Sequence, residues 1–73
     1  MEWEGVTYDD RHGGPFDRGS ADSYYRRGPD PHFYIGSTYQ SDRVDEGEMS
    51  VDEIKAYYAG YMYNEKEGDK KEY

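Results

Sequence analysis

Apolar residues recur at helical spacing in the stretch from Ser50 to Glu67. Three- and four-residue steps place one apolar stripe on a helix, made of Val51, Ile54, Tyr58, Tyr61 and Met62. This spacing predicts a helix from about Val51 to Glu65, with Tyr57 beside the stripe. We expect the stripe to face the core, with Tyr58 and Tyr61 largely buried.

Start and stop signals frame the same helix. Ser50 and Glu53 form the S-x-x-E pattern of a capping box, in which each side chain accepts the backbone N–H of the other residue. Lys66 falls in the last turn and Gly68 follows it, so the helix should end near residues 65–67.

A second helix is predicted from about Phe16 to Arg27. Pro15 suits the first turn, Gly28 suits the position after the helix, and Pro29 prevents continuation. Tyr24 should be buried on its inner side.

Small residues on the two predicted helices favour close packing. They are Gly19, Ser20, Ala21 and Ser23 on the first helix, and Ala56, Ala59 and Gly60 on the second. We therefore expect an all-α fold, a small two-helix hairpin packed antiparallel. Phe33 and Ile35, in the extended segment after the prolines, should lie across both helices.

The domain organisation follows from these elements. Residues 1–14 are predicted to form an extended arm, residues 15–68 a two-helix mini-domain with an irregular aromatic-rich connector, and residues 69–73 a frayed charged tail. A chain of 73 residues buries only about 60% of the surface that it exposes when unfolded. Its core must therefore be thin.

The composition changes the expected nature of this core. Leucine and cysteine are absent, and the only branched aliphatic residues are Val6, Ile35, Val44, Val51 and Ile54. Ten tyrosines and one tryptophan supply large apolar surfaces instead. We expect an aromatic mini-core, and completion of this core by a partner or a second copy remains an open alternative.

The net charge of −8 limits the kinds of partner that the chain can attract. Nucleic acids and anionic membranes would be repelled at long range, so the expected partner is a protein with a basic surface. The chain has neither an apolar run of about 20 residues nor a leader-like N-terminus, which favours a cytoplasmic protein.

Acidic and aromatic residues are the candidate contacts for such a partner. The most negative stretch is Asp42 to Glu53, whose carboxylates could imitate the phosphates of a nucleic acid. Exposed aromatic residues are favoured at binding hot spots. The candidate partner-binding residues are Trp3, Tyr25, Asp45, Glu46, Glu48, Tyr57 and Tyr63. For Trp3 the favoured alternative is that it covers the open side of the core.

One cluster of basic and aromatic residues, Tyr24 to Arg27, indicates an alternative function in RNA binding. The RNA-binding residues would then be Arg18, Arg26 and Arg27. Because the overall charge opposes phosphate binding, the favoured interpretation is that Arg26 and Arg27 pair within the chain, with Asp22 or Asp30 and with the acidic loop.

Metal and catalytic signals are weak. Residues 42–53 can be laid over a calcium-binding EF-hand loop, but Val44 occupies a ligand position and Glu53 belongs to the capping box. His12 and His32 have no zinc-type spacing, and no nucleophile or phosphate-binding motif is present. We expect a protein that is not an enzyme and that needs no metal or cofactor.

Three segments in order, FDRGSADSYYRRG, PHFY and IKAYYAGYMYNE, resemble a family of small proteins encoded by tailed bacteriophages. This resemblance implies host takeover or counter-defence, through binding and inhibition or modulation of a host protein. The outline is also loosely similar to ribosome modulation factor, a two-helix protein that binds ribosomal RNA. That likeness implies the alternative of a ribosome-associated factor.

Overall fold

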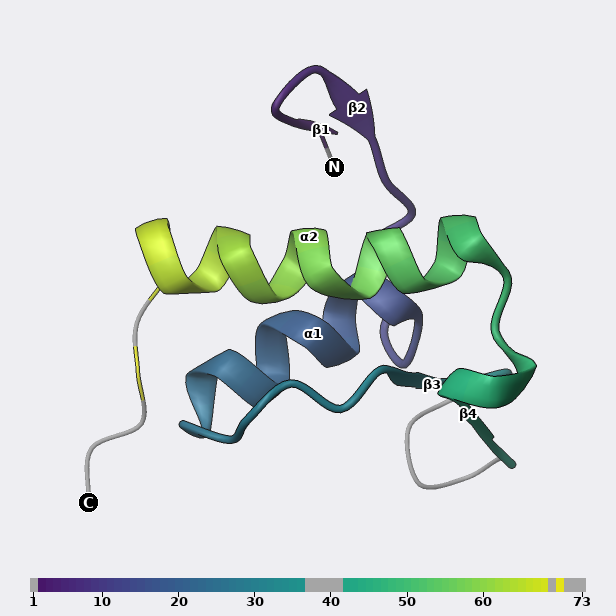
Figure 1. Ribbon diagram of the computed structural model, residues 1–73. Helices are drawn as coiled ribbons and strands as arrows, with labels where there is room; N and C mark the ends of the chain where they lie inside the picture. Colours follow the sequence, from purple (N-terminus) through teal and green to yellow (C-terminus); the bar gives the residue numbers. More distant parts are fainter. Residues whose placement is uncertain (1, 37–41, 69, 71–73) are drawn as a thin grey trace.

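Two helices form the body of the fold, and two short antiparallel sheets complete it (Figure 1). The computed structural model describes residues 2–36, 42–68 and 70. The elements in order are β1 (Glu2–Trp3), β2 (Val6–Thr7), α1 (Pro15–Tyr24), β3 (His32–Tyr34), β4 (Arg43–Asp45), the 3-10 turn η1 (Glu46–Glu48) and α2 (Val51–Glu67). The prediction of a mainly helical protein with two helices is confirmed. The pure helical fold is wrong, because β1 pairs with β2 and β3 pairs with β4.

α2 begins and ends as its local signals predict. The Ser50 amide donates to Oε1 of Glu53 at 2.8 Å, and the Glu53 amide donates to Oγ of Ser50 at 3.1 Å. The helix ends at Glu67, where the N–H of Gly68 donates to the carbonyl of Asn64. The capping box is confirmed.

Replacing Ser50 by alanine should lower the free energy of unfolding by about 0.5–2 kcal/mol, because the Glu53 amide loses its side-chain acceptor. Chemical denaturation measures this loss. Ser50→Asp is the control, since a carboxylate can still accept from that amide and should keep most of the stability. Equal stability of Ser50→Ala and wild type would mean that the cap does not form in solution.

α1 ends at Tyr24, earlier than predicted, and Gly28 has no part in its end. Arg26 takes the left-handed conformation, with φ of 61°. The N–H of Arg26 donates to Ser23 O and the N–H of Arg27 donates to Asp22 O, the two bonds of a Schellman cap. The prediction was wrong because it assigned this conformation to the nearest glycine rather than to Arg26.

The two helices run in the same general direction rather than antiparallel (Figure 1). Phe16 at the start of α1 lies against Gly60, whereas Ser23 at its end contacts Asn64 and Glu65 further along α2. The chain after α1 returns beside that helix, and the N–H of Tyr34 donates to Gly13 O, before the helix start. The prediction of an antiparallel hairpin is therefore wrong. The connector runs back along α1 to the start of that helix before α2 begins, so the two helices run in the same direction.

Glycines set the closest contact between the helices. A Cβ on Gly19 would lie 1.9 Å from the carbonyl oxygen of Tyr57, and one on Gly60 would lie 2.0 Å from that of Phe16. The small residues therefore permit the close packing that was predicted. They also fix which face of α2 is buried, namely that of Tyr57, Ala59, Gly60 and Asn64.

The predicted burial of three tyrosines is wrong. Tyr24 and Tyr58 are exposed and Tyr61 is half-buried, whereas Tyr57 is 0% exposed. The reason is that α2 turns its small-residue face, not its apolar stripe, toward α1.

The connector forms a small sheet in place of an apolar crossing. His32, Phe33 and Tyr34 of β3 pair with Asp45, Val44 and Arg43 of β4. His32 is buried, Phe33 is half-buried and Ile35 is 66% exposed. Ile35 is thus not laid across the helices, because the inward position of this strand belongs to His32.

The N-terminal arm is a hairpin on the side of α2 opposite β3 and β4 (Figure 1). Glu4 and Gly5 both have positive φ, as a two-residue hairpin turn of type I′ requires. Trp3 packs edge-on against Tyr63, with ring centroids 5.3 Å apart, and Tyr63 lies against Phe16. This aromatic chain joins the hairpin to the core. The predicted frayed tail lies largely outside the described residues.

Candidate functional site

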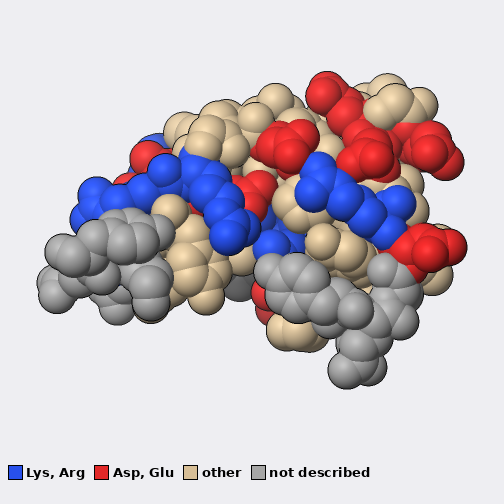
Figure 2. All heavy atoms as spheres, turned by 90° about the horizontal axis from the view of Figure 1, so that it is seen from below, with Lys and Arg blue, Asp and Glu red and all other residues tan. Residues whose placement is uncertain are grey.

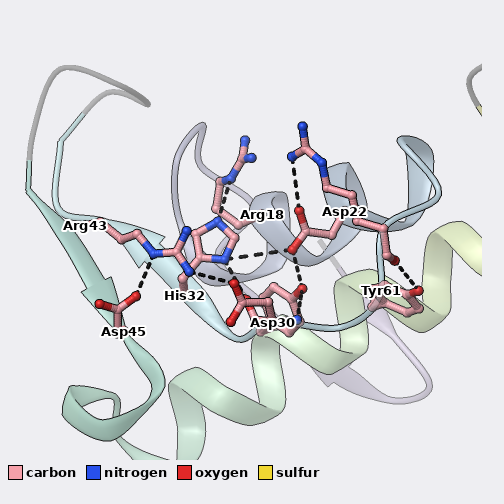
Figure 3. A network of polar contacts seen from close by, with 9 residues as sticks. Arg18, Asp22, Asp30, His32, Arg43, Asp45 and Tyr61 are labelled. Atoms are coloured by element: carbon pink, nitrogen blue, oxygen red, sulfur yellow. Dashed lines mark hydrogen bonds and ion pairs between the residues drawn. The ribbon is translucent and has the colours of Figure 1, made fainter.

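A buried polar network joins α1, β3 and α2 (Figure 3). The Tyr57 hydroxyl donates to the Asp22 carboxylate and accepts from the Asp30 amide at 2.9 Å. Nε of Arg18 donates to Nε2 of His32 at 3.3 Å. Histidine, aspartate and tyrosine are residue types that occur in catalytic centres, which makes this network a candidate site.

Hydrogen bonding defines the state of His32. Because a guanidinium only donates, Nε2 of His32 must accept, and the ring proton lies on Nδ1. That nitrogen is 2.6 Å from Asp30 O and 3.8 Å from Oδ2 of Asp22. Both of its neighbours are acceptors, so the neutral Nδ1–H form fits the network.

The central side chains of this network are closed to solvent. The side chains of His32 and Asp22 are 4% and 3% exposed, and Tyr57 is fully buried. Among the described residues, no buried side-chain nitrogen or oxygen lacks a hydrogen-bond partner. A substrate could reach the buried atoms of Tyr57, Asp22 and His32 only if the residues around them moved.

The network predicts a delayed ionisation of Tyr57. Burial raises its pKa above the ordinary value of 10.0, and the hydrogen bond to Asp22 raises the pKa further. Since the folded pKa exceeds the unfolded one, the stability that protonated Tyr57 contributes is complete below about pH 10 and is lost as the pH rises beyond it. The tyrosinate absorbance of wild type minus that of Tyr57→Phe should therefore appear only above pH 10, together with unfolding. A difference signal centred near pH 10 in the folded protein would contradict the burial of this hydroxyl.

The arginines predicted for RNA binding do not share an open surface. Arg18 is only 7% exposed and lies over the Tyr34 ring at 5.8 Å. Arg27 is exposed but pairs with Asp22 at 3.5 Å, which is the intramolecular pairing that the sequence favoured. Arg26 is exposed. Arg18 is therefore wrong as a surface contact, because its guanidinium is needed inside the fold.

The acidic candidates lie together on β4 and η1. Asp45, Glu46 and Glu48 are all exposed. Arg43 lies 2.6 Å from Asp45 and 2.7 Å from Asp30, and these hydrogen bonds, that to Asp45 first, raise the pKa of Arg43. On the face in Figure 2, acidic side chains gather at one end beside a band of basic ones. β4 is held in place by its pairing with β3, and the carboxylates of this acidic end are exposed to solvent.

The four aromatic candidates lie in different environments. Tyr25 is exposed, at an edge contact with Tyr24 and under the Arg27 guanidinium. Trp3 and Tyr63 are half-buried and pack together, so Trp3 covers one side of the core as the favoured alternative expected. Tyr57 was wrongly predicted as a partner contact, because its ring and hydroxyl belong to the buried network.

An open groove of about 530 Å³ runs between the N-terminal hairpin and α2. We call it the hairpin groove. It is lined by Trp3, Glu4, Val6, Tyr8, Ile54, Lys55, Tyr58, Ala59, Met62 and Lys66. Val6, Tyr58 and Met62 are 49%, 42% and 48% exposed. Sequence reasoning missed this site because it assigned the same stripe of α2 to the core.

The two ends of the groove differ in charge. At the end of α2, Lys66 lies 3.6 Å from Glu4 and 5.8 Å from the Trp3 ring centroid. Toward the start of α2 the groove continues into a second hollow, where the carboxylates of Asp9 and Asp52 outnumber the one basic residue, Lys55. Cationic groups of a ligand would therefore be favoured at the start of α2.

Comparison with known proteins found no matching family model, curated protein or solved structure. Within the described part of the chain, no three His, Cys, Asp or Glu side chains are grouped to hold a metal ion. Of the described helices, none is both long and apolar enough to cross a membrane.

Proposed function

We propose that this protein is a non-enzymatic interaction protein that binds a partner protein with a basic surface. The observation that carries the proposal is the orientation of α2. The helix uses its small residues against α1 and leaves Val51, Tyr58 and Met62 exposed. Tyrosine and methionine are enriched in the interfaces of protein complexes, so this exposed stripe supports a binding role.

Charge supports the choice of a basic partner. The chain carries a net charge of −8, and the acidic end formed by β4 and η1 presents exposed carboxylates beside α2. Such a field speeds association with a basic surface and opposes binding to nucleic acid. With the resemblance to tailed-bacteriophage proteins, the proposed partner is a host protein that is inhibited or modulated when its basic surface is occupied. Carboxylates in place of nucleic-acid phosphates are one way to occupy it.

Affinity capture from a bacterial lysate, with and without nuclease treatment, tests this proposal. The wild type should recover a basic protein whose yield survives nuclease. The yield should fall at least several-fold for Glu46→Gln with Glu48→Gln, and in moderate salt, because the attraction is electrostatic. The matched control removes two exposed charges elsewhere, with Asp10→Asn and Glu67→Gln, and should keep the yield.

The ribosome-associated alternative predicts a different result in the same experiment. Ribosomal subunits would be recovered, and they would be lost on replacing Arg26 and Arg27 by glutamate. That pattern would overturn the proposal. Equal loss in the acidic variant and in its matched control would also contradict it, because the acidic end would then have no particular role.

A further inference from the structure

We infer that the hairpin groove binds an amphipathic α-helix of the partner, with an apolar face and with lysines or arginines gathered at one end. This inference rests on the proposed function and specifies the partner's binding element. It is drawn from the shape, spacing and charge of the groove.

The spacing along α2 favours a helix over a strand. Val51, Ile54, Tyr58 and Met62 follow three- and four-residue steps, which form the ridges that a second helix packs against. Strand addition would need a row of free backbone groups, but β1 and β2 have two residues each. A helix needs only apolar anchors, and a groove of about 530 Å³ has room for several.

The hairpin forms the opposite wall of the groove and is held in place. Trp3 packs on Tyr63, and Tyr8 packs on Phe16 with ring centroids 5.4 Å apart. Two aromatic contacts thus join this short hairpin to the core. An incoming helix would meet a prearranged surface, which lowers the cost of binding.

The charges at the two ends of the groove indicate which kind of helix binds there and in which direction it lies. Lys66 is already paired with Glu4 at one end. At the other end, Asp9 and Asp52 outnumber Lys55, the one basic residue that lines it. The basic end of the bound helix should therefore lie near the start of α2. A second copy of this chain is disfavoured as occupant, because each copy carries a net charge of −8.

A designed peptide tests the inference without the natural partner. The probe is a synthetic peptide of about 18 leucines and lysines with leucine at helical spacing and lysines enriched at one end, a length of roughly five turns. Its controls are a scrambled peptide of the same composition and a leucine and glutamate version. Trp3 is the only tryptophan and lines the groove, so its fluorescence reports occupancy. The ordered basic peptide should bind at least tenfold more tightly than either control.

Variants locate the binding. Met62→Glu should weaken the peptide at least tenfold, whereas Ile35→Glu should leave its affinity unchanged, because Ile35 is exposed away from the groove. Both residues are exposed, so both variants should fold, and thermal melts check that they do. Equal binding of the scrambled peptide, or equal loss in both variants, would overturn the inference. So would a dimer, seen in sedimentation, that Met62→Glu dissociates.

Failure here is distinguishable from failure of the proposed function. A basic protein captured through Glu46 and Glu48, with no binding of the peptide, overturns the helix inference alone. Tight binding of the peptide supports the inference even when no basic protein is captured from the lysate, and it is then the proposed function that fails.

Discussion

Gly19→Ala is expected to remove most of the stability of this protein. The new Cβ would lie 1.9 Å from the backbone oxygen of Tyr57 and 2.9 Å from the backbone nitrogen of Tyr61. Backbone atoms of a helix cannot move aside as a flexible side chain can, so the helices must separate. The expected loss is about 3 kcal/mol or more, compared with a total of roughly 3–5 kcal/mol for a domain of this size.

A loss of stability in Gly19→Ala is informative because the helix propensity of alanine alone would raise the stability. Alanine is favoured over glycine inside a helix by about 1 kcal/mol, so any loss measures the contact between helices. Gly47→Ala, in the 3-10 turn η1, is the control for an added methyl group without a clash, since a Cβ there meets nothing within 4 Å. Denaturant unfolding followed by circular dichroism measures both variants. A Gly19→Ala protein as stable as the control would mean that α1 and α2 do not approach as described.

Tyr57→Phe is expected to have the second largest effect. The substitution keeps the ring but removes the hydroxyl that donates to Asp22 and accepts from the Asp30 amide. A buried charged acceptor then loses a donor, which costs about 1–3 kcal/mol or more. The free energy of unfolding should fall by about that amount.

Two further variants make this second prediction specific. Tyr58→Phe removes a hydroxyl from the exposed neighbour and should change stability by less than about 0.5 kcal/mol. The double variant, Tyr57→Phe with Asp22→Asn, should lose less free energy of unfolding than the two single variants lose in sum, because the two side chains share one hydrogen bond. Additive costs would argue against a direct hydrogen bond between them.

Local signals were sufficient to predict α2 and the start of α1. The capping box of Ser50 and Glu53, and Pro15 in the first turn, act within a few residues of the helix that they define. They carry no information about direction. The parallel course of the helices depends on the β3 return, which is fixed by contacts such as Tyr34 N–H to Gly13 O.

The core could not be predicted from apolar spacing, because two faces of α2 compete for burial. One carries Tyr58 and Met62, and the other carries Tyr57, Gly60 and Asn64. Hydrophobicity favours the first, but only the second lets two backbones meet. The same choice places the apolar stripe beside the N-terminal hairpin, so the error about the core and the missed groove have one cause.

The central claim, that the exposed stripe of α2 and the hairpin form a helix-binding groove, is tested most directly by nuclear magnetic resonance. The ordered basic peptide is titrated into the labelled protein, and the shift of each backbone amide is recorded. The claim predicts the largest shifts within residues 3–8 and at Tyr58, Met62 and neighbouring positions of α2. The largest shifts at Arg26, Arg27 and Asp30, or an even distribution over the acidic surface, would contradict it.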